Sequence, residues 1–234
     1  MLRLAGFSLL FVATMGIAHA DLIHSFNFDS SLTDSVGAAN GTIVGSAAVS
    51  GGQLVLNGGY VQFDAHIVPT SGSYSVSLDF QLATTDNPGI TEFISQGSSG
   101  GPGFYLGTNG FGFRATDSWG PSGSYDPADP HRLLFSVDNA AGKSYLYLDG
   151  ALLDTRNFAI TTTTGGTNTR LGSQFEPYGE LFHGTLDNVR IFDSAITPDQ
   201  DTGITGTPEP STMLLAGLGV AAALIARRRS EARQ

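Results

Sequence analysis

The sequence predicts an all-β sandwich of two antiparallel sheets, flanked by an N-terminal signal peptide and a short C-terminal hydrophobic helix. Short stretches of alternating apolar and polar residues recur through the central part of the chain, with glycine-rich turns between them. No segment of this central part has a sustained helical period of 3.6 residues. Each end of the chain carries an apolar run beside basic residues, which is typical of targeting segments.

The first twenty residues have the parts of a secretory signal peptide. Arg3 supplies the positive charge, an apolar run covers 4–17, and Ala18 and Ala20 form a small-x-small cleavage site. The run is short for a membrane span, which favours cleavage over a retained N-terminal helix. We therefore expect an exported mature chain that begins near Asp21.

The region 21–207 is long enough for one domain with a substantial core. The chain has no cysteine, which excludes disulfides, thiol catalysis and cysteine-ligated metals. This region has 6 Lys and Arg against 19 Asp and Glu, a net charge of −13. We expect such a domain to repel nucleic acid and anionic lipid, whereas divalent cations and neutral ligands such as sugars are compatible with it.

The alternation is clearest over 74–82, where apolar side chains fall on one face and polar ones on the other. Asp149 and Gly150 separate two further strand patterns and predict a hairpin on a tight turn. Some ten short strands favour a sandwich over a barrel at this length. The expected strands lie at 23–28, 53–56, 60–63, 74–82, 92–96, 104–106, 111–115, 133–137, 145–148, 151–153 and 186–192.

Three sequence blocks then point to a family. The chain opens with FNFD, SLTD and NGT between 26 and 42, continues with FSVD and SYLYLDG between 135 and 150, and closes with FHGTLDNVRIF at 182–192. In this order they resemble a laminin-G-like domain of the concanavalin A-like superfamily, over nearly all of 21–198. The resemblance implies a jelly-roll sandwich whose first and last strands lie close together.

A second targeting segment lies at the C-terminus. An apolar run over 213–226 would span about 21 Å as a helix, against roughly 30 Å of hydrocarbon core, so it is short for a permanent anchor. A Pro-Glu-Pro motif precedes the run and three arginines follow it, which resembles a PEP-CTERM sorting signal over 207–234. The residues that carry this resemblance are Pro208, Glu209, Pro210, Arg227, Arg228 and Arg229.

The sorting resemblance implies a Gram-negative bacterium in which an inner-membrane exosortase binds the protein transiently and removes the tail. The released protein would reach the cell surface or the extracellular matrix, where such proteins are linked to exopolysaccharide or biofilm. The alternative is a plain C-terminal membrane anchor. The expected domains are a signal peptide at 1–20, the sandwich at 21–198, a linker at 199–206 and the sorting signal at 207–234.

No catalytic residue is expected. Glycoside hydrolases need two carboxyl groups flanking the scissile bond, and the Glu-x-Asp-x-x-Glu motif of retaining enzymes with the resembled fold has no counterpart here. The nearest pair, Glu176 and Glu180, lies in a stretch with Pro and Gly that predicts a loop. The histidines are too scattered for a metal pair: His24, His66, His131 and His183.

A structural calcium ion is the one cofactor we expect. Asp29, Asp34 and Asn40 lie in the opening segment and Asp187 lies near the close, and the resemblance brings these two regions together with a calcium between them. Their oxygens are the ligands that calcium prefers. The alternative is that these Asp and Asn side chains accept hydrogen bonds from backbone N–H groups in turns.

The predicted ligand-binding segment is the long loop 117–127, which holds the only tryptophan. Asp117, Trp119 and Tyr125 are the candidate contacts, because an aromatic ring can stack on a sugar while polar groups bind its hydroxyls. The alternative is that Trp119 folds back as a lid on the core. The expected function is a non-catalytic, carbohydrate-binding module, and the alternatives are a structural matrix protein without a dedicated ligand or a glycoside hydrolase.

Overall fold

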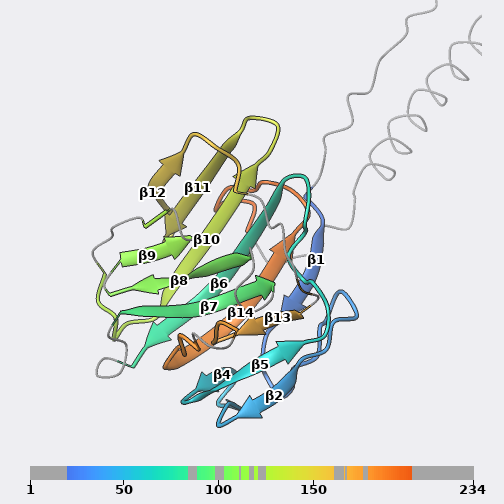
Figure 1. Ribbon diagram of the computed structural model, residues 1–234, viewed down its shortest axis with the longest axis vertical. Coiled ribbons are helices and arrows are strands. Elements are labelled where there is room, and N and C mark those ends of the chain that lie inside the picture. Colours follow the sequence, from blue (N-terminus) through green and yellow to red (C-terminus); the bar gives the residue numbers. More distant parts are fainter. Residues whose placement is uncertain are drawn as a thin grey trace, which may run out of the picture.

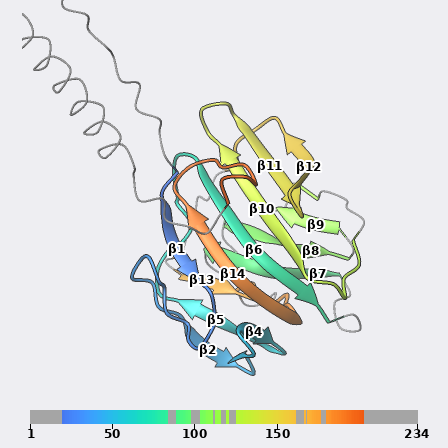
Figure 2. The same ribbon diagram turned by 180° about the vertical axis from the view of Figure 1, so that it is seen from behind.

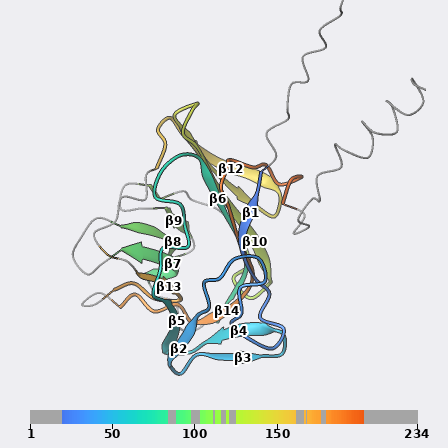
Figure 3. The same cartoon turned by 90° about the vertical axis from the view of Figure 1, so that its right-hand side faces the viewer.

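The computed structural model describes residues 20–83, 89–97, 103–110, 112–115, 119–120, 125–160, 166, 168–175 and 179–201. These residues form two antiparallel sheets packed face to face, seen edge-on in Figure 3. The described part of the chain contains no helix. The predicted all-β sandwich is confirmed, and its strand arrangement agrees with a jelly roll.

The larger sheet, sheet A, has the strand order β12-β11-β10-β6-β14-β4-β3, and β1 pairs with β14 beside that path (Figure 2). Its strands are β1 (Leu22–Phe26), β3 (Ala48–Ser50), β4 (Gln53–Leu56), β6 (Tyr74–Leu82), β10 (His131–Asp138), β11 (Lys143–Leu148), β12 (Ala151–Arg156) and β14 (Gly184–Phe192).

The smaller sheet, sheet B, has the order β2-β5-β13-β7-β8-β9 (Figure 1). Its strands are β2 (Thr42–Gly45), β5 (Gly59–Phe63), β7 (Ile90–Gly97), β8 (Phe104–Asn109), β9 (Gly112–Ala115) and β13 (Asn168–Leu171).

The core lies between the two sheets and follows the alternation of the sequence. On β6, Val76, Leu78 and Phe80 point into one continuous apolar cluster, and Phe135 of β10 and Phe93 of β7 join it. Their side chains are at most 2% exposed. Because successive residues of a strand point to opposite faces, the polar residues between them lie on the outer face of sheet A.

The hairpin at Asp149-Gly150 is confirmed. Asp149 has φ 50° and Gly150 has φ 80°, the two positive values that a type I′ turn requires. The turn joins β11 to β12, whose register runs from Leu148 opposite Ala151 to Ser144 opposite Arg156.

β14 connects the first strand to the rest of sheet A. One edge pairs with β6, and the other pairs first with β4 and then with β1, where Phe26 lies opposite Val189. Asn188, with φ 47°, lies where the β6 register shifts. The first and last strands are therefore neighbours, as the family resemblance implied.

Segment 193–201 after β14, here called the strap, packs back onto the outer face of sheet A. Ile196 joins Leu134 and Phe192 in a small second apolar cluster, against which Ala20 and Leu22 also pack. The strap thus meets the first described residues of the chain, and the entry and exit of the sandwich lie at the same end (Figure 1).

Strand predictions were confirmed except at three short elements. β2, β3 and β13 were missed, and the strand predicted at 23–28 ends at Phe26. Phe28 has φ 49°, outside the range of a strand, although its side chain is buried in the core. Residue 111 of the predicted strand 111–115 lies outside the described residues.

Candidate functional site

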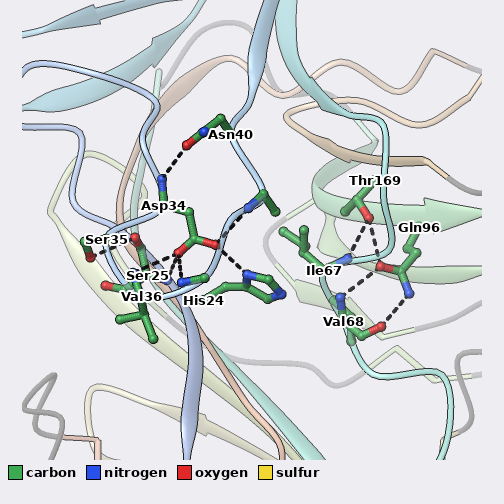
Figure 4. Close-up of polar contacts among 12 residues, drawn as sticks. His24, Ser25, Asp34, Ser35, Val36, Asn40, Ile67, Val68, Gln96 and Thr169 are labelled. Atoms are coloured by element: carbon green, nitrogen blue, oxygen red, sulfur yellow. Dashed lines mark hydrogen bonds and ion pairs between the residues drawn. The ribbon is translucent and has the colours of Figure 1, made fainter.

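The opening segment is organised by the buried carboxylate of Asp34 (Figure 4). Its Oδ1 accepts hydrogen bonds from the backbone N–H groups of Ser25 (3.0 Å), Val36 (3.2 Å) and Gly37 (2.9 Å). Its Oδ2 accepts the Ala39 N–H at 3.3 Å and contacts Nδ1 of His24 at 2.5 Å. The side chain therefore fixes β1 and the following loop to each other.

This environment sets the charge state of Asp34 and uses up its oxygens. Burial alone would raise the pKa of Asp34, but hydrogen bonds from the His24 ring and from the backbone lower it below the ordinary value. Asn40 accepts the Asp34 backbone N–H at 3.2 Å. Asp34 and Asn40 were correctly predicted to lie together, but they do not fit a calcium ion, because N–H and ring donors already occupy their oxygens.

Asp187 lies on β14, on the outer face of sheet A. It stands opposite Asp79 of β6, which binds Arg132 at 2.6 and 2.9 Å and accepts an N–H from Asn188 at 2.9 Å. Burial raises the pKa of Asp187, and the nearby charges of Asp79 and Asp29 raise it further. Asp29 and Asp187 are therefore close enough to interact electrostatically.

A metal site with three or more protein side chains is not assembled in the described ranges. There, no three His, Asp or Glu side chains are grouped so that they could hold an ion. The predicted set of four ligands is thus divided between the Asp34 loop and the region around Asp187.

Trp119 is a core residue, and its prediction as an exposed sugar-stacking residue is wrong. The side chain is 1% exposed and packs against Phe135, with ring centroids 6.0 Å apart. Its indole N–H donates to Oδ2 of Asp154 at 2.6 Å, and the Arg156 guanidinium lies 5.8 Å from its ring. A large apolar surface with a satisfied polar atom gains more from burial than from exposure, so the lid alternative is confirmed.

Tyr125 is half-buried at the same end of the core. Its ring stacks on Phe113 at 5.1 Å and contacts Phe80 and His131 edge-on. Burial raises the pKa of Tyr125 to about 12. The third candidate of this loop, Asp117, lies outside the described residues.

A buried ionic cluster on sheet B was missed at the sequence level. Glu92, Gly107 and Arg114 lie side by side on β7, β8 and β9. Arg114 forms a close ion pair with Glu92 and binds Oε2 of Glu180 at 2.7 Å, while Gln174 donates to the same oxygen at 2.7 Å. A Cβ at position 107 would lie 1.9 Å from a backbone oxygen. A glycine is therefore required here, and no side chain stands between Glu92 and Arg114.

The cluster holds two carboxylates against one guanidinium. Glu92 is fully buried, which raises its pKa well above the ordinary value; Arg114 opposes this shift, and Glu180 adds to it. Glu176, the other member of the pair considered from the sequence, lies outside the described residues. Only strand register could have revealed this cluster, because Glu92 and Arg114 meet across an intervening strand.

A second polar network is structural (Figure 4). Oε1 of Gln96 accepts the Val68 N–H at 2.9 Å, and its Nε2 donates to the Val68 carbonyl at 2.7 Å. The Thr169 hydroxyl lies 2.8 Å from the same Oε1. These buried contacts tie the segment after β5 to sheet B.

The targeting residues lie mostly outside the described ranges. Ala18 of the predicted cleavage site does so, whereas Ala20 is half-buried at the start of the sandwich. The sorting residues Pro208, Glu209, Pro210, Arg227, Arg228 and Arg229 also lie outside them. Within the described ranges, no helix has the length and apolar character needed to cross a membrane.

Comparisons with known families match two parts of the chain. The profile of the concanavalin A-like lectin/glucanases superfamily (a laminin-G type) matches residues 56–200, more than half of the chain. A PEP-CTERM protein-sorting motif matches residues 207–229, which confirms the interpretation of the C-terminal segment. A search among curated proteins finds no match.

Solved structures share the fold at low identity. Domain 4 of AbnA, a GH43 extracellular arabinanase from Geobacillus stearothermophilus, in complex with arabinotriose, aligns at TM-score 0.65 and 23% identity, over 80% of this chain and 99% of that domain. The binding domain of botulinum neurotoxin DC in complex with SialylT aligns at TM-score 0.58 and 15% identity, over 78% of this chain and 50% of that one. The same binding domain in complex with rat synaptotagmin II aligns at TM-score 0.59 and 17% identity, over 77% and 50%.

The two sheets, the pairing of β1 with β14 and the match over 56–200 agree with one another. The chain therefore belongs to the concanavalin A-like lectin/glucanase superfamily and carries a C-terminal PEP-CTERM sorting motif.

Proposed function

We propose that this protein is an exported substrate of an exosortase in a Gram-negative bacterium, and that its sandwich binds carbohydrate without cleaving it. The exosortase removes the tail at the inner membrane, and the domain then acts at the cell surface or in the exopolysaccharide matrix. The sorting motif at 207–229 supports the first part. Membership of a lectin/glucanase superfamily supports the second.

One observation carries the carbohydrate assignment. The sandwich aligns with 99% of an arabinanase domain that was solved with arabinotriose bound. The similarity therefore covers that whole domain rather than a shared strand motif. The strong negative charge of the sandwich also favours a neutral ligand over an anionic one.

The ionic cluster of sheet B supports the non-catalytic assignment. A glycosidase needs one carboxyl group that donates a proton and a second that attacks or activates water, both beside the substrate. Glu92 is fully buried, and Arg114 binds both Glu92 and Glu180. Carboxylates held in this way stabilise an arginine instead of facing a sugar.

A glycan array with the exported protein tests the proposal. Saturable binding to a neutral glycan is the expected result, with no release of reducing ends on prolonged incubation. A folded protein that binds no glycan would instead favour a structural matrix protein. Release of reducing ends would identify a hydrolase.

Deleting the exosortase gene tests the sorting assignment separately. The expected result is accumulation of a membrane-bound form that keeps the C-terminal tail, detected by mass spectrometry of its C-terminal peptide. An unchanged mature form in the deletion strain would contradict processing by exosortase.

A further inference from the structure

A cleft opens where β4 and β6 end and β14 begins. Its volume is about 420 Å³, within the range of small-molecule sites. Val55, Thr185 and Gln81 form its outward-facing row, because Thr185 lies between the other two in the sheet register. Asn57 and His183 extend it beyond the strand ends.

The described residues that line the cleft are uncharged, and four of them carry polar side chains. It offers two amides, a hydroxyl and an imidazole, from Asn57, Gln81, Thr185 and His183, beside the aliphatic Val55. No Asp, Glu, Lys or Arg is among the described residues that line it. Amide and hydroxyl groups can both donate to and accept from sugar hydroxyls.

The walls of the cleft are held by contacts that require no ligand. The Gln81 amide donates to the Ala128 carbonyl, and the Ala83 N–H donates to the His183 carbonyl at 3.0 Å. Phe182 is fully buried against Phe93, with ring centroids 5.0 Å apart. A preorganised site loses less entropy on binding than a site that must first order its side chains.

Gly184, at the start of β14, also lines the cleft. Its φ is 151°, and a Cβ there would lie 2.1 Å from the Gln81 carbonyl oxygen and 2.8 Å from the Phe182 ring. Only glycine lets β14 begin this close to β6.

The cleft also lies far along sheet A from the start of the strap. Ser75, which binds the strap, and Gln81, which lines the cleft, are six residues apart on β6, a separation of about 20 Å along a strand. The strap ends at Asp201, whose carboxylate accepts the Ser77 hydroxyl, four residues or about 13 Å before Gln81 along β6.

From these observations we infer that the cleft at the ends of β4, β6 and β14 is a binding subsite for a neutral saccharide. The inference rests on the proposed carbohydrate-binding function and assigns it to a place. Asn57, Gln81, Thr185 and His183 bind the hydroxyl groups, and Val55 packs against an apolar ring face. An anionic polymer is disfavoured by the charge of the protein.

The test compares two variants in the cleft, using the full-length protein purified in detergent. The probe is the neutral oligosaccharide bound most tightly on an array that includes arabinotriose, with a polyuronate as the anionic comparison. Thr185→Phe fills the cleft and should weaken binding by more than about tenfold, and Asn57→Ala should weaken it about fivefold. Asn57 is exposed, so its variant also remains informative if Thr185→Phe fails to fold.

Matched substitutions elsewhere serve as controls. Thr155→Phe adds the same ring to the outer face of β12, opposite Tyr145, and Asn139→Ala truncates an exposed asparagine in the β10–β11 turn. Both should leave affinity within about twofold. Binding that survives both cleft variants would overturn the cleft assignment alone. A folded wild-type protein that binds no neutral glycan would overturn the proposed function together with the cleft, and tighter binding of the polyuronate would overturn the neutral-ligand assignment.

Discussion

At the residue scale, the single side chain of Asp34 holds the opening loop together. Four backbone N–H groups and the His24 ring converge on its carboxylate. Asp34→Asn replaces one acceptor oxygen with a donor that faces other donors. We expect a loss of about 2 kcal/mol in the free energy of unfolding at pH 7, measured by urea denaturation. Asp64→Asn is the control, since Asp64 is exposed and accepts one side-chain hydrogen bond.

The same carboxylate predicts a pH dependence. Because the folded-state pKa of Asp34 lies below its ordinary value, its stabilisation is present above pH about 4 and is lost as the pH falls through the folded-state pKa. The stability difference between the wild type and Asp34→Asn should therefore shrink below pH 4. A difference that stays constant from pH 7 to pH 3 would contradict this role for the charge.

The burial of Trp119 can be tested by fluorescence, because it is the only tryptophan of the chain. A side chain that is 1% exposed should emit at shorter wavelength than in the unfolded protein and resist quenching by iodide. Trp119→Ala should cost about 3–5 kcal/mol in unfolding free energy, since a large core side chain is removed. Trp119→Phe keeps an aromatic ring and should leave glycan affinity unchanged. Iodide quenching equal to that of free tryptophan would rule out the lid.

The site residues show what the sequence could and could not predict. Spacing was sufficient to place Asp34 and Asn40 in one loop, but not to show that backbone donors would fill their oxygens. The composition of the Trp119 loop fits a lid and a sugar platform equally well. The choice between them depends on the contacts with Phe135 and Asp154, which belong to strands β10 and β12.

At the element scale, strand register joins Glu92 and Arg114. Arg114→Met would leave Glu92 without its counter-charge in a dry environment and should cost about 3–5 kcal/mol at neutral pH. The cost should grow as the pH rises, because a carboxyl whose folded-state pKa is raised loses stability on ionising. Urea denaturation between pH 4.5 and 8 measures both effects.

The double variant Glu92→Gln/Arg114→Met is the control for this cluster. It removes both buried charges, so most of the stability lost in Arg114→Met should return. A double variant as unstable as the single one would show that Arg114 acts through packing, including its contact with Tyr105 at 5.2 Å, rather than through charge.

The calcium site is still predicted at β14, around Asp187. Asp187 faces Asp79 across the sheet with Asp29 nearby, so like charges oppose each other there and a cation would relieve the repulsion. We expect calcium to raise the melting temperature by several degrees over chelator. Asp187→Asn should abolish that difference, whereas Asp34→Asn should keep it. Equal melting temperatures of the wild type in calcium and in chelator would contradict a calcium site in this protein.

The position of each strand in its sheet explains which strands could be predicted from the sequence. β6 shows a clear alternation in its sequence because its apolar residues face the core and its serines, Asp79 and Gln81 face outward. β2, by contrast, is exposed along its length at the edge of sheet B, so no alternation marks it. β13 has four residues, too few for a period to show, and pairing with β5 and β7 makes it a strand.

At the scale of the whole molecule, both ends of the sandwich are fixed at one place. The Asp21 backbone N–H donates to Oδ1 of Asp193 at 3.1 Å, and the Asp193 N–H donates to the Asp21 carbonyl at 3.1 Å. Asp201, the last described residue, contacts Arg190 at 3.2 Å and the Ser77 hydroxyl at 2.5 Å. The strap is therefore bound to sheet A up to the residue from which the chain continues toward the sorting motif.

This arrangement predicts how the domain stands on a membrane before its tail is removed. The apolar run begins at residue 213, and the chain from Asp201 to that point reaches at most about 40 Å. This segment tethers the strap end to the bilayer, whereas the cleft lies about 13 Å beyond the Ser77 contact of Asp201 along β6. The chain has no cysteine, so Asp199→Cys on the strap and Asn57→Cys at the cleft each give one labelling site. With the full-length protein in vesicles, a fluorophore at 199 should be quenched by lipids that carry a headgroup quencher more strongly than one at 57. Equal quenching at both positions would show that the sandwich lies on its side, and the cleft would then lose its outward orientation.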